Sequence, residues 1–111
     1  MKAMLLAAGF GTRLRPLTDT IPKCLVPIHD KPLLDYWLDL LLSHGIERIL
    51  INTHYLSETV THHIQQSKWH ARVDQIHEDV LLGTAGTLKA NADYFRNEAF
   101  FVAHADNLTR F

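Results

Sequence analysis

Cysteine is almost absent from this sequence, since Cys24 stands alone among 111 residues. An intramolecular disulfide is therefore impossible, which favours a reducing, cytoplasmic location. A catalytic role for the Cys24 thiol is the less favoured alternative, because a lone cysteine between prolines is usually a small packed residue. The eight histidines lack the paired spacing of a zinc site and are expected to be surface or packed side chains.

Long apolar runs and an excess of one charge are also missing. No stretch reaches the roughly 20 apolar residues of a transmembrane helix, and the run after Lys2 is too short for a signal peptide. Eleven basic residues nearly balance twelve acidic ones, and the formal net charge is -1. This balance gives no general attraction to nucleic acid or to an anionic membrane. Phosphate binding would need a local cluster of positive groups.

Apolar residues make up 47% of the chain, which is enough for the core of one domain. Apolar runs predict buried strands at 2–7, 47–52, 73–77 and 99–103. Helical spacing predicts three helices, one from a cap at Asp30 to a stop at Gly45, one from a cap at Ser57 to Gln66, and one over 83–91. This alternation predicts a Rossmann-like α/β fold, a parallel sheet with helices on both faces.

The irregular stretch after the first strand carries most of the functional information, because such long loops in compact domains are normally functional. Gly9 and Gly11 let the backbone come close to a ligand, and successive N–H groups can then bind phosphate oxygens. Arg13 adds a planar guanidinium, and Lys23 can return to the same place as a point charge. A dinucleotide fingerprint would need glycine at Leu14, and the ATPase P-loop would need Gly-Lys-Ser/Thr, so neither applies. An ordinary glycine turn remains the alternative.

Several motifs follow one another along the whole chain. They are Leu-Ala-Ala-Gly-Phe-Gly-Thr-Arg-Leu-Arg-Pro-Leu-Thr at 6–18, Ile-Pro-Lys-Cys-Leu-Val-Pro-Ile at 21–28, Lys-Pro-Leu at 31–33, Asn-Thr-His-Tyr-Leu at 52–56, Leu-Gly-Thr-Ala-Gly-Thr-Leu at 82–88 and Ala-Asp-Asn at 105–107. Together they resemble the N-terminal part of sugar-1-phosphate nucleotidyltransferases, a family that includes mannose-1-phosphate guanylyltransferases. The resemblance implies a nucleotidyltransferase fold and an enzyme that joins a nucleoside triphosphate to a sugar 1-phosphate and releases pyrophosphate.

The resemblance also implies roles in triphosphate binding. In the family the glycine loop, here Ala8, Gly9, Gly11 and Thr12, wraps the triphosphate. Arg13, the arginine of that loop, neutralises the departing pyrophosphate. Such transfer depends mainly on positioning and on neutralising charge, so these residue types suit the reaction.

Two further charged residues receive roles from the same resemblance. Lys23, in the Pro-Lys pair, contacts the phosphate that is attacked, and Asp106, after the last strand, holds Mg²⁺. Magnesium prefers few carboxylates together with phosphate oxygens and water, which fits a single aspartate. A solvated surface charge is the alternative for Lys23, for Arg13 and for Asp106.

The base pocket is expected at Glu78, Gly83 and Thr84. Relatives that bind uracil or thymine tend to carry glutamine where Glu78 stands. A carboxylate only accepts hydrogen bonds, whereas guanine offers two adjacent donors, its ring N–H and its amino group. Glu78 therefore favours GTP, with a solvated strand-end charge as the alternative.

The family's catalytic domain is at least about twice as long, so the sugar-binding segments and a second metal-binding aspartate are not in this sequence, which ends at Phe111. The chain is expected to be the nucleotide-binding half of such an enzyme, as a fragment or as a natural short paralogue. A truncated, non-catalytic nucleotide-binding module is the alternative function. The strand at 99–103 would then be an exposed apolar edge, which predicts self-association.

Overall fold

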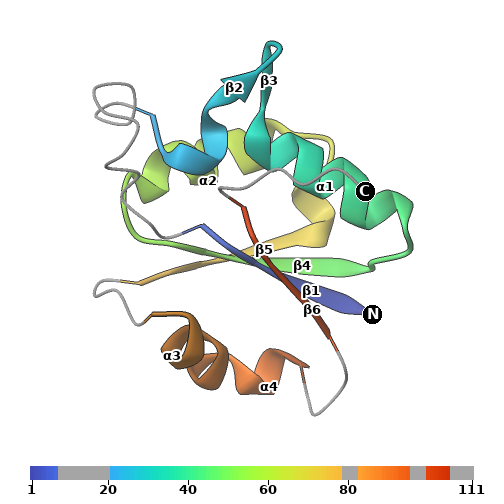
Figure 1. Ribbon diagram of the computed structural model, residues 1–111, viewed down its shortest axis with the longest axis vertical. Coiled ribbons are helices and arrows are strands. Elements are labelled where there is room, and N and C mark those ends of the chain that lie inside the picture. The colour runs from blue at the N-terminus through green and yellow to red at the C-terminus, as the bar shows by residue number, and fades with distance from the viewer. Residues whose placement is uncertain (8–20, 79–82, 96–99, 106–111) are drawn as a thin grey trace.

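Four short apolar segments pair as parallel strands in the computed structural model, which describes residues 1–7, 21–78, 83–95 and 100–105. The strands lie in the order β5-β4-β1-β6 (Figure 1). Their bounds are Lys2–Leu6 for β1, Arg48–Thr53 for β4, Val73–His77 for β5 and Phe100–His104 for β6. All four predicted strands are thus confirmed, with ends that differ by at most one residue.

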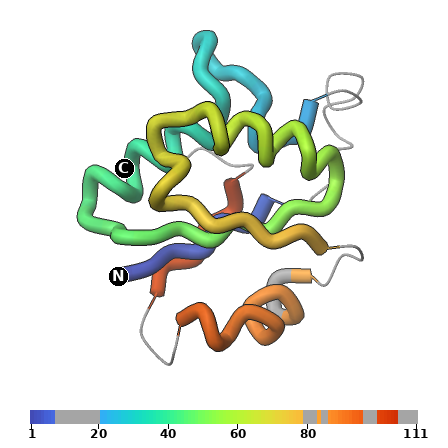
Figure 2. The backbone as a smooth tube through the Cα atoms, turned by 180° about the vertical axis from the view of Figure 1, so that it is seen from behind, coloured from blue at the N-terminus to red at the C-terminus, as the bar shows by residue number. Residues whose placement is uncertain are grey.

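Helices cover both faces of this sheet, as predicted (Figures 1 and 2). Helices α1 (Leu33–Ser43) and α2 (Ser57–Gln66) lie on one face, and α3 (Gly83–Ala90) and α4 (Ala92–Phe95) lie on the other. In the described part of the chain, the 3-10 helices η3 (Lys23–Leu25) and η4 (His70–Arg72) join other elements. Within the described ranges, no helix has both the length and the apolar character needed to cross a membrane. The short helix α4 was not predicted from the sequence.

Strand β1 explains why the core has two parts. Ala3 and Leu5 point to the face of α1 and α2, where they join a cluster that includes Leu38. Met4 and Leu6 point to the opposite face and belong to a second cluster of buried residues. Because both faces are covered, the strand is apolar at nearly every position instead of alternating with polar residues.

The start of the first helix corrects one expectation. Asp30 does not cap it, because residues 27–32 form a hairpin of β2 (Pro27–Ile28) and β3 (Lys31–Pro32). The two turn residues, His29 and Asp30, have φ of 51° and 64°. A two-residue hairpin turn of this kind requires positive φ at both positions, and aspartate tolerates it better than most residues. Helix α1 therefore begins only after Pro32.

Ser57 does not cap the second helix either. The cap position belongs to Leu56, whose φ of 53° is left-handed, and no side chain caps the helix. The Ser57 hydroxyl instead donates to the carbonyl of His54 at 3.1 Å and lies 2.5 Å from Nδ1 of His77. A serine cap would accept a backbone N–H on its side-chain oxygen, and Ser57, already the first helical residue, does not. Gly45, by contrast, ends α1 as predicted, with φ of 90°.

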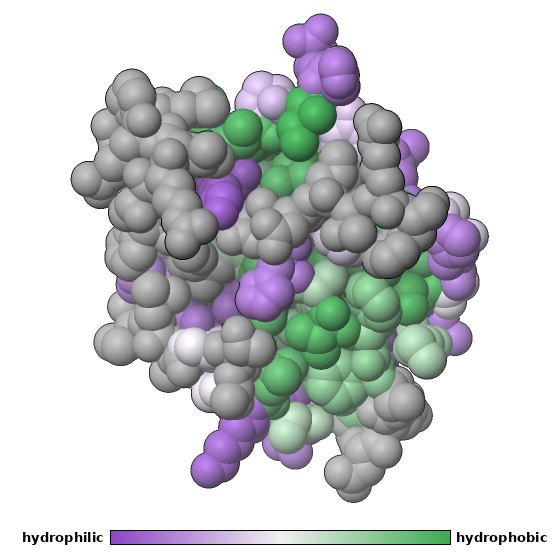
Figure 3. All heavy atoms as spheres, in the orientation of Figure 1, coloured by the Kyte–Doolittle hydropathy of each residue, from purple (hydrophilic) through white to green (hydrophobic). Residues whose placement is uncertain are grey.

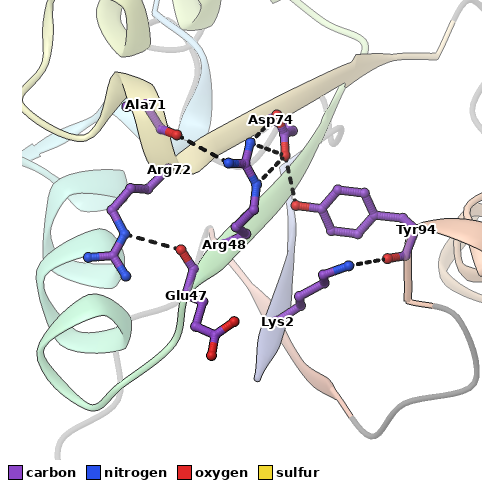
Figure 4. A network of polar contacts seen from close by, with 7 residues as sticks. All are labelled: Lys2, Glu47, Arg48, Ala71, Arg72, Asp74 and Tyr94. Atoms are coloured by element: carbon purple, nitrogen blue, oxygen red, sulfur yellow. Dashed lines mark hydrogen bonds and ion pairs between the residues drawn. The ribbon is translucent and has the colours of Figure 1, made fainter.

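A network of polar side chains joins the amino ends of the strands to α4 (Figure 4). Arg48 Nη2 donates to both carboxylate oxygens of Asp74 at 2.8 Å. The Tyr94 hydroxyl donates to the same carboxylate at 2.8 Å, and Lys2 Nζ donates to the Tyr94 carbonyl at 2.8 Å. Burial opposes ionisation of Asp74, but the hydrogen bonds from Arg48 and Tyr94 outweigh it and hold the pKa below its ordinary 3.8.

We expect Tyr94→Phe to lower the free energy of unfolding by about 1 kcal/mol near neutral pH, because the hydrogen bond is charge-assisted but partly exposed to solvent. Burial and the bond to Asp74 raise the pKa of Tyr94 from 10.0 to about 12. A raised pKa stabilises the fold below the ordinary value, so this contribution is complete below pH 10.0 and is lost as the pH rises to about 12. Urea unfolding followed by tryptophan fluorescence measures it.

The lowered pKa of Asp74 acts at the other end of the pH range. Its contribution to stability is present above pH 3.8 and is lost as the pH falls through the lower folded value. Asp93→Asn, on the exposed side of the same short helix, is the matched control and should leave stability unchanged. Equal unfolding curves for the wild type and Tyr94→Phe would show that the network contributes nothing.

Candidate functional site

The carboxyl ends of the four strands meet at one edge of the sheet, where parallel α/β proteins bind their ligands. Among the hydrogen bonds that the described residues make between the segments leaving the strands there, three have a main-chain N–H as donor. Ala105 donates its N–H to the carbonyl of Leu6 at 3.0 Å, and Glu78 donates its N–H to the carbonyl of Thr53 at 2.6 Å. The third, from Ala7, ends on a side chain. Hydrogen bonds other than those between the paired strands therefore hold the segments at this edge together.

Asn52, near the end of β4, makes that third bond. Its side chain is only 3% exposed, and its Oδ1 accepts the N–H of Ala7 at 2.7 Å. Ala7 is the last described residue before the glycine loop. A buried amide therefore fixes the direction in which the chain leaves β1. No role was predicted for Asn52, although a polar residue ending an apolar strand is a signal for one.

Glu78 is buried, not a solvated strand-end charge. It is 6% exposed, and its Oε2 accepts a hydrogen bond from the Thr87 hydroxyl at 2.5 Å. Within the described part of the chain, its Oε1 is buried and has no hydrogen-bond partner. Burying such an acceptor without a donor costs free energy, so a donor from outside this set of residues would relieve a real penalty.

Lys23 lies at the start of η3, half-buried, between the described residues that follow the glycine loop and the hairpin. The turn is closed by the N–H of Leu25, which donates to the carbonyl of Pro22 at 2.9 Å. Cys24 and Leu25 are buried in the core and anchor this turn. The buried Cys24 fits the predicted packing role rather than a catalytic one.

Gly83 begins α3 with φ of 72°, a conformation that side chains rarely adopt. Thr84 follows it in the same helix. The other residues predicted to bind phosphate or metal lie outside the described residues, namely Ala8, Gly9, Gly11, Thr12, Arg13 and Asp106. Lys23 follows the glycine loop, Glu78 follows β5 and Gly83 begins α3, as the sequence predicted. Their predicted roles stay predictions.

The described residues include no group of three or more histidine, cysteine, aspartate or glutamate side chains that could hold a metal ion. The prediction that the histidines are not a zinc site stays a prediction. Magnesium needs fewer protein ligands, because phosphate oxygens and water complete its shell. Asp106 directly follows Ala105, whose N–H is bonded to the end of β1. That bond fixes the point from which the chain continues to Asp106.

The parallel sheet, the covering helices and the polar edge together define the fold of nucleotide-diphospho-sugar transferases. The chain belongs to the nucleotidyl transferase family, because the family model described as "Nucleotidyl transferase" matches residues 2–111. Among solved structures, HddC from Yersinia pseudotuberculosis, complexed with GMP-PN, is similar with a TM-score of 0.82 and 32% identity. CTP:phosphocholine cytidylyltransferase (LicC) from Streptococcus pneumoniae has a TM-score of 0.75 and 33% identity. Both matches cover 95% of this chain, together with 47% of the HddC chain and 44% of the LicC chain.

Curated relatives give the same family. A UTP–glucose-1-phosphate uridylyltransferase of Synechocystis is 37% identical over 97% of this chain and 31% of its own length. The catalytic subunit beta of mannose-1-phosphate guanylyltransferase from Danio rerio is 36% identical over 100% of this chain and 32% of its own length. The chain thus spans about a third of the curated relatives that it matches. The resemblance to sugar-1-phosphate nucleotidyltransferases is confirmed, but the relatives differ in their nucleotides.

We expect Asn52→Leu to increase hydrogen exchange at the Ala7 amide by about ten-fold, because the apolar side chain offers no acceptor for that N–H. Exchange followed by mass spectrometry or NMR measures the change. Asn91→Ala is the matched control, since it also removes a buried amide but acts on the carbonyl of Thr87. Unchanged exchange at Ala7 in Asn52→Leu would show that the side chain does not hold this segment.

Proposed function

We propose that this chain provides the nucleotide-binding half of an enzyme that transfers a guanylyl group from GTP to a sugar 1-phosphate and releases pyrophosphate. The observation that carries the choice of base is the buried carboxylate of Glu78 at the carboxyl edge of the sheet, with Oε1 lacking a partner among the described residues. A carboxylate accepts from both donors of guanine but cannot donate to the carbonyl groups of uracil. The mannose-1-phosphate guanylyltransferase relative and the GMP-PN complex of HddC support this proposal.

The proposed reaction forms one bond and breaks another at the α-phosphorus. An oxygen of the sugar phosphate attacks this atom, and the bond to the leaving pyrophosphate breaks. The attacking phosphate is already ionised near neutral pH, so no general base is required. Lys23 would contact the phosphate under attack, and Arg13 would neutralise the departing pyrophosphate. Bound Mg²⁺, held by Asp106 and phosphate oxygens, would supply further charge neutralisation.

The glycine loop and the end of β1 have separate tasks in this proposal. Ala8, Gly9, Gly11 and Thr12 would present N–H groups to the triphosphate, as in the family. The bond between Asn52 and Ala7 supports this placement, because it fixes where the loop begins. Gly83 and Thr84 would line the base pocket beside Glu78. A cytoplasmic location is supported by the single cysteine.

Nucleotide binding without turnover is the second candidate function. The roles proposed above concern the nucleotide, the pyrophosphate and the metal ion, and none of them concerns the sugar. The two candidates make different demands on the same edge of the sheet. Binding needs only Glu78 and the phosphate-binding residues, whereas turnover also needs a place for the sugar phosphate.

We expect Glu78→Gln to abolish the preference for GTP, since an amide can donate to a uracil carbonyl as well as accept. Release of pyrophosphate, with mannose 1-phosphate or glucose 1-phosphate as acceptor, reports turnover, and calorimetric titration with GTP and UTP reports binding alone. The wild type should favour GTP by about ten-fold or more, and the variant should lose this preference. Replacing Mg²⁺ by a chelator should abolish turnover.

Glu58→Gln, an exposed change of the same chemistry on α2, is the matched control and should keep the preference for GTP. Binding of GTP without pyrophosphate release would favour the second candidate. A wild type that binds GTP and UTP equally would contradict the role of Glu78.

We further propose that two copies associate through β6. Among the described residues β6 pairs with β1 alone, so the main-chain groups of its other edge have no strand partner there. Phe101 on this strand is 43% exposed. Apolar side chains gather over β6 in the space-filling view (Figure 3). An apolar edge of this kind tends to pair with another chain.

Sedimentation at micromolar concentration is expected to show a dimer, and Phe101→Lys should shift it to monomer, because a charged residue on an edge strand opposes pairing. Leu40→Lys is the matched control, since Leu40 is similarly exposed, at 40%, but lies on α1. A wild type that sediments as a clean monomer would contradict the proposal. An equal effect of Leu40→Lys would place the contact on the helix instead.

A further inference from the structure

Thr87 connects helix α3 to the buried carboxylate at the sheet edge. Its side chain is 1% exposed, and its hydroxyl donates to Oε2 of Glu78 at 2.5 Å. Bonds from a hydroxyl to a carboxylate in this range of distance are charge-assisted and stronger than neutral ones. Asn91 holds the same turn of the helix, because its Nδ2 donates to the Thr87 carbonyl at 2.8 Å. The hydroxyl is therefore presented from a fixed backbone.

The backbone of Glu78 is held on both sides as well. Its N–H donates to the carbonyl of Thr53 at 2.6 Å. Its carbonyl lies 2.5 Å from Nδ1 of His54, and because a carbonyl only accepts, Nδ1 of His54 carries the proton and donates it. Together with the bond from Thr87, these contacts engage every polar atom of Glu78 except Oε1 among the residues that the structure describes.

This arrangement leaves the carboxylate one orientation. A glutamate carboxyl group rotates readily about its last bond, and its two oxygens then exchange places. A half-turn only replaces one oxygen by an equivalent one, but the bond from Thr87 opposes every intermediate rotation, because that would leave a buried hydroxyl without its acceptor. Oε1 is therefore presented in a constant direction. A fixed acceptor discriminates between ligands far better than a mobile one, since it cannot turn away from a ligand that lacks the matching donor.

We propose that Thr87 is a positioning residue for base specificity, and that its hydroxyl orients Glu78 toward a purine base that carries a 2-amino group beside a ring N–H. The inference rests on the proposed function, because it takes the base to be bound at Glu78. It adds a residue for which the sequence predicted no role. It also names the chemical feature that is read, the exocyclic amino group.

Titration with GTP and with inosine triphosphate in the presence of Mg²⁺ tests this inference, because the two nucleotides differ only in the 2-amino group. The wild type should bind GTP about ten-fold more tightly. Thr87→Val keeps the shape but removes the hydroxyl, and it should lose most of this ratio through weaker binding of GTP. Thr87→Ser keeps the hydroxyl and should retain the ratio.

Two controls separate positioning from a structural role. Asn91→Ala removes a neighbouring buried hydrogen bond without touching the hydroxyl, so it should lower thermal stability but keep the ratio. Thr87→Ala replaces the valine variant if that one does not fold, and it should lose the ratio in the same way. A preserved ratio in Thr87→Val or Thr87→Ala, or equal losses for both nucleotides, would overturn the inference. A wild type that binds both nucleotides equally would instead refute the assignment of the base to Glu78.

Discussion

The burial of β1 on both faces is the constraint on which the rest of the structure depends. Its side chains alternate between two apolar clusters, and its main chain pairs with β4 on one edge and β6 on the other. A strand held in this way cannot shift in register, because a shift by one residue would exchange the two sets of side chains. The point where the chain leaves β1, at Ala7, is therefore fixed relative to the neighbouring strands.

Much of this could be predicted from the sequence, because burial on both faces makes β1 and β4 continuous apolar runs, and the partly exposed β6 is an apolar run as well. The errors lie where local chemistry had more than one solution. Asp30 satisfies the preferences of a helix cap and also those of a hairpin turn with positive φ, and only the pairing of Pro27–Ile28 with Lys31–Pro32 decides between them. Ser57 likewise suits both a helix cap and the first helical position, and in the structure its hydroxyl donates to the carbonyl of His54.

For the polar residues of the candidate site, too, the sequence could predict positions along the chain but not contacts in space. Gly83 could be placed at this edge because it lies in a motif with a known order, and Glu78 because it directly follows a predicted strand. Thr87 and Asn52 act through bonds to residues 9 and 45 positions away in the sequence, and no local pattern encodes such a partner. Burial of Glu78 could not be predicted either, since the covering helix α3 follows it in the chain. These contacts of the candidate site are long-range, and only the fold reveals them.

The two ends of the sheet are stabilised by different physics, and this difference bears on function. At the amino ends, Arg48, Asp74 and Tyr94 form a partly exposed network of charges, which contributes modestly and depends on pH and salt. At the carboxyl ends, buried side chains of Asn52 and Thr87 hold main-chain and carboxylate groups in place. The two sets of contacts lie at opposite ends of the strands, so a substitution such as Tyr94→Phe would lower stability at the amino end and leave the bond between Thr87 and Glu78 in place.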